Sequence, residues 1–147
     1  MKIMIINGPN INLTGIREQD VYGDKDYNAL CNFIREKGRS LNIDLDIVQS
    51  NIEGEIINEI HRAYFEKYDG IVINPGAYTH YSIAIYDALK SVNIKAVEVH
   101  LSNIHSREEY RKKSVTSGAC IGQISGFGFF SYGLALEALI NSCIKEL

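Results

Sequence analysis

The sequence predicts an α/β protein of 147 residues, in which five parallel strands alternate with helices. Three observations support this fold class. Short β-branched runs recur along the chain, segments with helical periodicity lie between them, and two of the runs are apolar without interruption. Uninterrupted apolar runs are typical of parallel strands that are covered by helices on both faces. Strands and helices in this alternation form one open sheet with right-handed crossovers.

The five predicted strands differ in how deeply they should be buried. The first (3–6) and third (71–73) are continuously apolar and are expected inside the sheet. The second (43–48) alternates isoleucine or leucine with aspartate, which is typical of a half-exposed edge strand. A fourth run covers 96–99, and a weaker fifth run covers 119–124.

Four segments carry apolar stripes at helical spacing, and they begin near Tyr27, Ile56, Ile83 and Leu136. Asp26 stands directly before the first stripe, where its carboxylate can cap a helix. Five strands in so short a chain predict a single catalytic domain, residues 1–147, folded as a flavodoxin-like three-layer sandwich rather than a barrel.

Composition excludes several classes of protein. The 15 basic residues are outnumbered by 18 acidic ones, and a net charge of −3 disfavours nucleic acid as a partner. Cys31, Cys120 and Cys143 are far apart and form no C-x-x-C pair, which favours the reducing cytoplasm over a disulfide framework or a zinc site. The first apolar run is too short for a signal peptide or a membrane span.

Polar side chains collect after three of the predicted strands, in 7–24, 74–80 and 100–112. In an open α/β sheet, ligands bind beyond the carboxyl ends of the strands. Each of these loops contributes an amide, a histidine or an arginine, and the three loops converge in space. We therefore interpret them as the walls of one site.

Taken singly, most of these residues have ordinary explanations. Residues 7–10 alone form a turn, and His80 alone is a polar residue at a helix start. Arg107 and Arg111 are four apart, which predicts one face of a short helix and often means a solvated face. Glu98 and His100 are different, because they lie two apart on a buried strand and therefore on the same face. Such a pair has few purely structural explanations.

Several motifs together resemble one family. The segments "NGPNINLTGIRE", "QSNIEGEIINEIH", "GIVINPGAYTHYSIAIYDAL", "EVHLSNIHSREEYRKKS" and "GFGFFSYGLALEAL" resemble the type II 3-dehydroquinate dehydratases over nearly the whole chain. The resemblance implies a flavodoxin-like hydro-lyase that uses no cofactor and no metal. It implies dehydration of 3-dehydroquinate to 3-dehydroshikimate, by anti elimination through an enolate, in the shikimate pathway to chorismate and the aromatic amino acids. Whether the role is biosynthetic or runs in quinate breakdown stays open.

The resemblance also assigns catalytic roles. Tyr22 is implied as the base, and because a phenol is a weak base at neutral pH, Arg17 on the same loop would favour its phenolate. Asn10 would hold a water against the enolate oxygen. His100 is implied as the general acid, with Glu98 setting its tautomer and charge.

The remaining implied residues bind the substrate. Asn74 and His80 would contact the region of the departing hydroxyl and a second hydroxyl. The substrate carboxylate is expected at the backbone N–H groups of Leu101 and Ser102 and at the Ser102 hydroxyl. Arg111 would bind the ring hydroxyls from the far side.

Three further expectations concern support, assembly and closure. Arg107 is expected as a nearby support. The family forms cytoplasmic dodecamers, built as a tetramer of trimers, in which Asp87 would reach a neighbouring subunit's site. Residues 15–24 would form a lid that carries the base. Many members have proline where this chain has Gln19, which predicts a looser lid.

Three other functions were weighed. A nucleotide- or flavin-binding module would need a glycine-rich or hydroxyl-rich phosphate loop after the first strand, which residues 7–10 do not provide. A metal-dependent hydrolase built on His80, His100 and His105 would lack an H-x-x-x-H pair and acidic partners. A non-catalytic oligomeric scaffold is disfavoured, since this chain carries the polar residues of the family's motifs.

Overall fold

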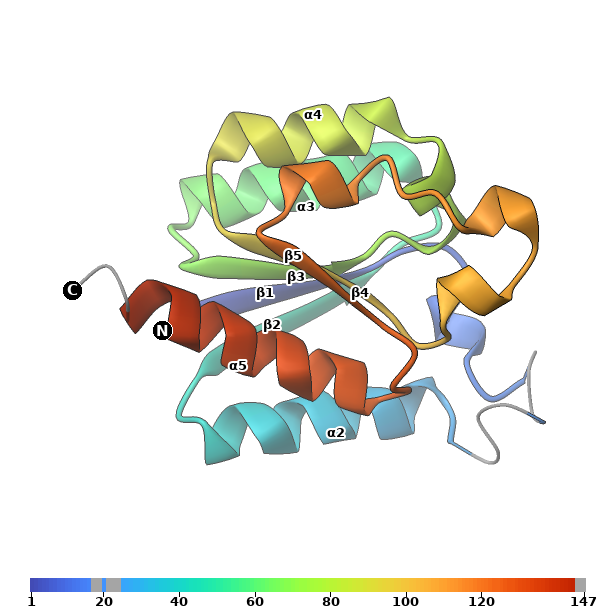
Figure 1. Cartoon of the computed structure of the whole chain (residues 1–147). Helices are drawn as coiled ribbons and strands as arrows, with labels where there is room; N and C mark the ends of the chain where they lie inside the picture. Colours follow the sequence, from blue (N-terminus) through green and yellow to red (C-terminus); the bar gives the residue numbers. More distant parts are fainter. Residues whose placement is uncertain (17–19, 21–24, 145–147) are drawn as a thin grey trace.

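The structure, a computed structural model, describes residues 1–16, 20 and 25–144. A five-stranded parallel sheet in the order β2-β1-β3-β4-β5 lies between two layers of helices (Figure 1). Helices α2 and α5 cover one face, and α3 and α4 cover the other. The strands are β1 (Lys2–Asn7), β2 (Asp44–Gln49), β3 (Gly70–Asn74), β4 (Ala96–His100) and β5 (Gly122–Ser125). The helices are α2 (Tyr27–Ser40), α3 (Glu53–Phe65), α4 (Ile83–Val92) and α5 (Phe130–Ile144). The predicted fold class is therefore confirmed.

The fifth strand begins later than the sequence predicts. Ala119 belongs to a 3-10 helix (Ser117–Ala119), and β5 starts only at Gly122. The backbone N–H groups of Ala119 and Cys120 donate to the carbonyls of Thr116 and Ser117, which closes a turn before the chain joins β4. Apolar composition alone does not reveal such a turn.

The core consists of two clusters, one on each face of the sheet. Ile3 and Ile5 pack beneath α2 and α5, whereas Met4 and Ile6 pack beneath α3 and α4. Successive side chains of a strand point to opposite faces, so a strand that is covered on both sides is apolar at every position. The prediction of buried first and third strands is confirmed, and β2 is the predicted edge strand.

Two of the central helices begin at capping side chains. Asp26 accepts a hydrogen bond from the Ala29 N–H at 2.8 Å, which confirms the predicted cap. Ser82 accepts from the Ile85 N–H at 3.0 Å and begins α4 in the same way. Within the described residues, no helix combines the length and the apolar character needed to cross a membrane.

The turns that follow β1 and β3 interlock. Gly8 donates its N–H to the Asn74 carbonyl at 2.8 Å, and a Cβ at Gly8 would lie 2.6 Å from the Pro75 carbonyl oxygen. Gly76 has a φ of +59°, and a Cβ there would lie 2.9 Å from the Pro9 oxygen. Glycine is required at both positions because the backbones are in contact. Pro9 and Gly76, which meet in this contact, both line a cavity at this end of the sheet.

Candidate active site

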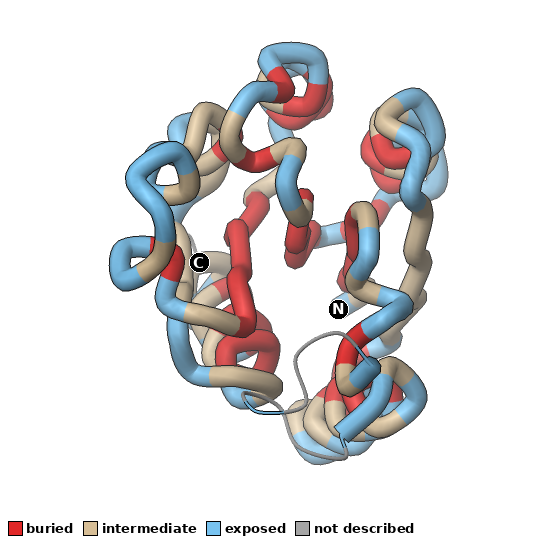
Figure 2. Tube along the Cα trace, turned by 90° about the vertical axis from the view of Figure 1, so that its right-hand side faces the viewer, coloured by how far each residue is buried: buried red, intermediate tan, exposed pale blue. Residues whose placement is uncertain are grey.

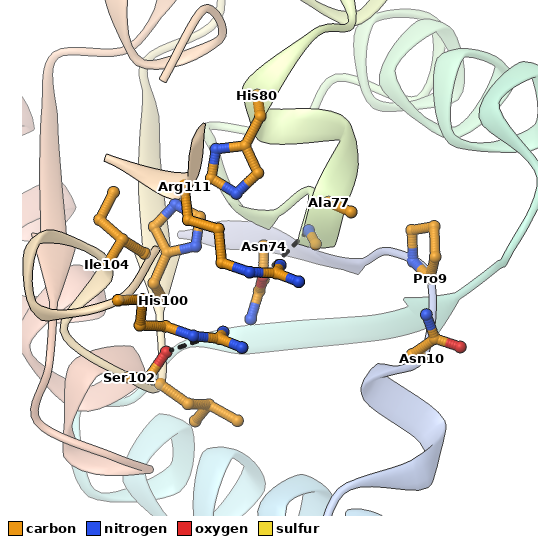
Figure 3. Close-up of a pocket in the computed structure, with 12 residues that line it drawn as sticks. Pro9, Asn10, Asn74, Ala77, His80, His100, Ser102, Ile104 and Arg111 are labelled. Atoms are coloured by element: carbon orange, nitrogen blue, oxygen red, sulfur yellow. Dashed lines mark hydrogen bonds between the residues drawn. The ribbon is translucent and has the colours of Figure 1, made fainter. Parts of the chain in front are cut away.

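A cavity of about 110 Å³ opens at the carboxyl ends of the strands. Figure 2 views the molecule from this end, with the buried strand ends in the centre and more exposed loops around them. The cavity takes its lining from the loops after β1, β3 and β4 (Figure 3). It is lined by Pro9, Asn10, Asn74, Gly76, Ala77, His80, His100, Leu101, Ser102, Ile104, Arg107 and Arg111.

His100 and Glu98 form a buried pair on β4. The Nε2 of His100 lies 3.1 Å from Oε2 of Glu98, and both residues are buried. Because an ionised carboxylate only accepts hydrogen bonds, Nε2 carries a proton, and Nδ1 is the ring nitrogen not bonded to Glu98. The predicted contact between the two side chains is confirmed.

Glu98 is fully buried, yet its carboxylate has several hydrogen-bond donors. Ser114 Oγ lies 2.8 Å and Gln123 Nε2 lies 2.6 Å from Oε2, while Thr116 Oγ1 donates to Oε1. Burial raises the pKa of Glu98, but hydrogen bonding and charge from His100, with bonds from Thr116 and Gln123, outweigh burial. The pKa of Glu98 is therefore held below its ordinary value.

His80 also lines the cavity and is drawn on the same side of Figure 3 as His100. Its Nδ1 is 2.7 Å from the carbonyl oxygen of Lys113. A carbonyl only accepts, so Nδ1 carries the proton and Nε2 is an acceptor in the neutral ring. In its neutral form His80 can therefore accept a hydrogen bond from a ligand at Nε2.

Asn74 is held by a buried polar chain. Its Nδ2 donates to the Tyr132 hydroxyl at 3.0 Å, and its Oδ1 accepts from the Gly76 N–H at 3.2 Å. The Tyr132 hydroxyl donates in turn to Oδ1 of Asn7 at 2.7 Å. These contacts fix which end of the Asn74 amide is nitrogen. With respect to the hydrogen bonds of the described residues, one N–H and one lone pair of Asn74 remain for a ligand.

Asn10 is presented by a turn in the left-handed region, with φ of 67°. Its backbone N–H donates to Oδ1 of Asn51 at 3.1 Å, and Gln49 Nε2 donates to the Gly8 carbonyl at 3.2 Å. The loop after β2 therefore supports the Asn10 turn from behind.

The two arginines both line the cavity, but not from one helix. Arg107 follows a 3-10 helix (Ile104–Ser106), and Arg111 ends another (Glu109–Arg111). The prediction of a single helical face is wrong, because the chain extends between the two turns. Arg111 Nε donates to Glu108 at 2.9 Å, and Figure 3 shows its side chain extending into the cavity. Arg107 approaches the Ser102 hydroxyl at 3.5 Å.

The charge of the cavity lining is one-sided. Two guanidinium groups and two imidazoles face it, and among the described residues no carboxylate belongs to the lining. Leu101 and Ser102 lie in the lining directly after β4, where the sequence expected a carboxylate-binding backbone. Such a lining suits an anionic ligand that also carries hydroxyl groups.

Some predicted residues lie elsewhere. Asp87 is on α4 and is not among the described residues that line this cavity, so its predicted contact with a neighbouring subunit stays a prediction. Arg17, Gln19 and Tyr22 lie outside the described residues. His105 is exposed and does not line the cavity, so the three histidines required by a metal hydrolase are not brought together.

Sequence reasoning missed four residues around the site: Ser114, Thr116, Gln123 and Tyr132. The serine and threonine lie in a loop without periodicity, and Gln123 lies on the weakest predicted strand. Tyr132 lies near the start of the apolar helix α5, where an aromatic residue is expected to pack in the core. A buried tyrosine needs a hydrogen-bond partner, which was the one available signal.

Fold and site together define an α/β protein with a buried glutamate–histidine pair and an arginine-lined cavity at the carboxyl edge of a parallel sheet. The chain belongs to the family described as dehydroquinase class II, whose family model matches residues 1–140. A 3-dehydroquinate dehydratase from Clostridium perfringens is 69% identical over 141 residues, which cover 96% of this chain and 98% of the relative. A Clostridium acetobutylicum protein of the same name is 63% identical over 145 residues, covering 99% and 100%.

Solved structures agree with this assignment. The crystal structure of a type II dehydroquinase from Butyrivibrio crossotus superposes with a TM-score of 0.93 at 55% identity, covering 95% of this chain and 97% of that one. A type II dehydroquinase from Propionibacterium acnes gives a TM-score of 0.90 at 40% identity, with 95% and 96% covered. The family resemblance predicted from the motifs is confirmed.

Proposed function

We propose that this protein dehydrates 3-dehydroquinate to 3-dehydroshikimate in the shikimate pathway. One observation carries the proposal: a buried Glu98–His100 pair opens into a cavity that holds two arginines and, among the described residues, no carboxylate. The substrate is a cyclic ketone with a carboxylate and several hydroxyl groups, so its charge and its leaving group match this lining. Membership of the class II dehydroquinase family supports the same conclusion.

The reaction breaks one C–H and one C–O bond and forms a C=C bond. A base removes a proton from the carbon beside the ketone, and the electron pair moves to the carbonyl oxygen to give an enolate. When the enolate collapses, the hydroxyl on the neighbouring carbon leaves with a proton from an acid, as water. The enzyme must therefore supply a base, an acid and a group that stabilises the enolate oxygen.

His100 is the proposed acid. With Nε2 bonded to Glu98, a second proton on Nδ1 makes an imidazolium whose charge is balanced by the carboxylate. Transfer of the Nδ1 proton to the departing hydroxyl leaves the neutral tautomer that Glu98 already favours. Both residues are buried, so the attraction between the imidazolium and the carboxylate is stronger than it would be in water.

The substrate is held by the remaining lining. Arg111 is proposed to bind the ring hydroxyls of the substrate. The backbone of Leu101 and Ser102 is proposed to bind its carboxylate. His80 contributes Nε2 as an acceptor for a hydroxyl, and Asn74 contributes the N–H left over from its bond to Tyr132. Asn10 is the proposed holder of the water that stabilises the enolate. Arg107 supports Ser102.

Tyr22 is the proposed base, activated by Arg17, and closure of residues 15–24 would bring both to the substrate. Tyr22→Phe is expected to lower kcat by at least about 10²-fold, since a phenyl ring accepts no proton. Initial rates of product formation measure the effect. Tyr64→Phe, at an exposed position on α3, is the matched control and should keep the wild-type rate. Equal rates for Tyr22→Phe and wild type would remove Tyr22 from the proton path.

The stereochemical course gives a separate test. An anti elimination removes the proton on the ring face opposite the departing hydroxyl. 3-Dehydroquinate carrying deuterium at one of the two positions of the reacting CH₂ group should therefore lose the label opposite the hydroxyl and retain the other. Mass spectrometry of the product distinguishes the two. Retention of the opposite label would contradict the proposed placement of base and acid.

Assembly and location complete the proposal. We infer a dodecamer, a tetramer of trimers, in the cytoplasm, with Asp87 completing the site of a neighbouring subunit. The position of Asp87 on α4, outside the lining of its own cavity, supports this arrangement. A monomeric, fully active enzyme in light scattering would contradict it.

A further inference from the structure

Glu98 receives its donors from separate parts of the fold. Ser114 and Thr116 lie in the loop after the Glu109–Arg111 turn, and Gln123 lies on β5. We call these three residues the Glu98 cage. Their donor atoms contact both carboxylate oxygens of Glu98, and Nε2 of His100 contacts Oε2. The carboxylate is thus enclosed by side chains of the neighbouring strand β5 and of the loop that contains Ser114 and Thr116.

Enclosure of this kind has a direct physical consequence. A carboxylate that is fully buried is costly to ionise unless its lone pairs are satisfied. The cage satisfies them with neutral donors, which add hydrogen bonds without adding a competing positive charge. His100 on β4 can therefore be the partner that balances the negative charge. The thiol of Cys120 also lies near Glu98, and burial followed by the Glu98 charge raises its pKa to about 12.

The loop that provides two of the cage residues also contacts the second histidine. The Lys113 carbonyl accepts from Nδ1 of His80 at 2.7 Å. Val115 then donates its N–H to the Thr79 carbonyl at 2.8 Å, which ties the loop to the turn that carries His80. Residues 113–116 therefore contact His80 directly at its Nδ1 and contact His100 through Glu98, which accepts its Nε2 proton.

We propose that Ser114, Thr116 and Gln123 are positioning residues that hold Glu98 ionised and aimed at His100, and that residues 113–116 set the proton positions of both histidines in the cavity. The inference rests on the acid role proposed for His100. None of the cage residues lines the cavity, so they act through Glu98 rather than on the substrate.

The pH profile of the nitrogen-15 shifts of the His100 ring separates this role from a merely structural one, because the ring contacts Glu98 and senses its protonation, whereas Tyr22, the proposed base, would set the acidic limb of a kcat profile. The pKa of Glu98 is held low in the folded protein, so Glu98 loses its charge only at a pH below the ordinary pKa of a glutamate side chain. Thr116→Val removes one donor and raises the pKa of Glu98. The acidic transition of the nitrogen-15 profile should move to higher pH by about one unit. Thr116→Ser keeps the hydroxyl and should reproduce the wild-type profile.

Two further variants keep the proposal testable if Thr116→Val does not fold. Ser114→Ala and Gln123→Leu each remove a different donor and should move the acidic transition in the same direction. Ser142→Ala, whose hydroxyl bonds only to its own helix at the Leu139 carbonyl among the described residues, is the matched control for deletion of a hydroxyl. Acidic transitions of all three cage variants that coincide with those of Thr116→Ser and Ser142→Ala would overturn the proposal.

A readout without substrate distinguishes failure of this inference from failure of the proposed function. Nitrogen-15 NMR of labelled histidine reports which ring nitrogen carries the proton. In wild type we expect His100 protonated at Nε2 and His80 at Nδ1. In a Thr116→Val/Gln123→Leu double variant, His100 should show mixed tautomers while His80 is unchanged. An unchanged His100 spectrum would contradict the positioning role proposed for the Glu98 cage, whether or not 3-dehydroquinate is turned over.

Discussion

His100→Ala is expected to lower kcat for 3-dehydroquinate by about 10²–10⁴-fold, the range that a general acid typically contributes. The substitution removes the group that would protonate the departing hydroxyl, and hydroxide is a poor leaving group without that proton. KM should change much less than kcat, because Arg111 and the backbone after β4 remain to bind the substrate. The decisive measurement is a full rate–concentration curve for the variant and wild type.

Two controls make that result interpretable. His61→Ala removes an exposed histidine on α3 and should leave both kinetic constants unchanged. Thermal unfolding of His100→Ala should show a folded protein, since the cage still satisfies Glu98. If a folded His100→Ala variant kept kcat within about threefold of wild type, far less than a general acid contributes, another residue would have to be the acid.

Glu98→Gln is expected to reduce both activity and stability. The two carboxylate oxygens accept from Ser114, Thr116, Gln123 and His100. An amide presents one oxygen and one NH₂ group, so at least one buried donor would face another donor. Leaving a buried polar group unsatisfied costs about 1–3 kcal/mol of the free energy of unfolding. The loss of the charge beside His100 should also lower kcat.

The stability difference should depend on pH in a defined direction. The pKa of Glu98 is depressed in the folded state, so its stabilising contribution is present above its unfolded pKa and is lost as the pH falls through its folded pKa. Urea unfolding should therefore show the full difference between wild type and Glu98→Gln at neutral pH and a smaller one in acid. Glu137→Gln, in a half-exposed ion pair with Lys37, should change stability by less than about 1 kcal/mol. A difference that grew in acid would contradict the account.

Strand composition and the rule for open sheets were sufficient to predict where the cavity lies. The uninterrupted run at 71–73 marks a central strand, and the polar residues that follow it line the cavity. Glu98 and His100 could be paired from spacing alone, because alternate residues on a strand share a face. Asp26 could be recognised as a cap because the residue type and its position before the apolar stripe agree.

The parts that could not be predicted depend on contacts between distant segments. The enclosure of Glu98 joins a strand to residues 16 to 25 positions away, in a loop without periodicity and on the edge strand β5. Tyr132 meets Asn7 across 125 residues of sequence. The single helix expected for Arg107 and Arg111 failed because i, i+4 spacing is also compatible with two successive 3-10 turns. Spacing along the chain does not reveal which of these geometries the chain adopts.

The most direct test of the proposed function is turnover of 3-dehydroquinate by the wild-type protein in the presence of EDTA, followed by the enone absorbance of the product. We predict steady formation of 3-dehydroshikimate at the same rate with and without the chelator. Turnover abolished by EDTA and restored by a divalent metal would contradict a mechanism built on side chains alone. A folded wild-type protein with no turnover would contradict the proposed function itself.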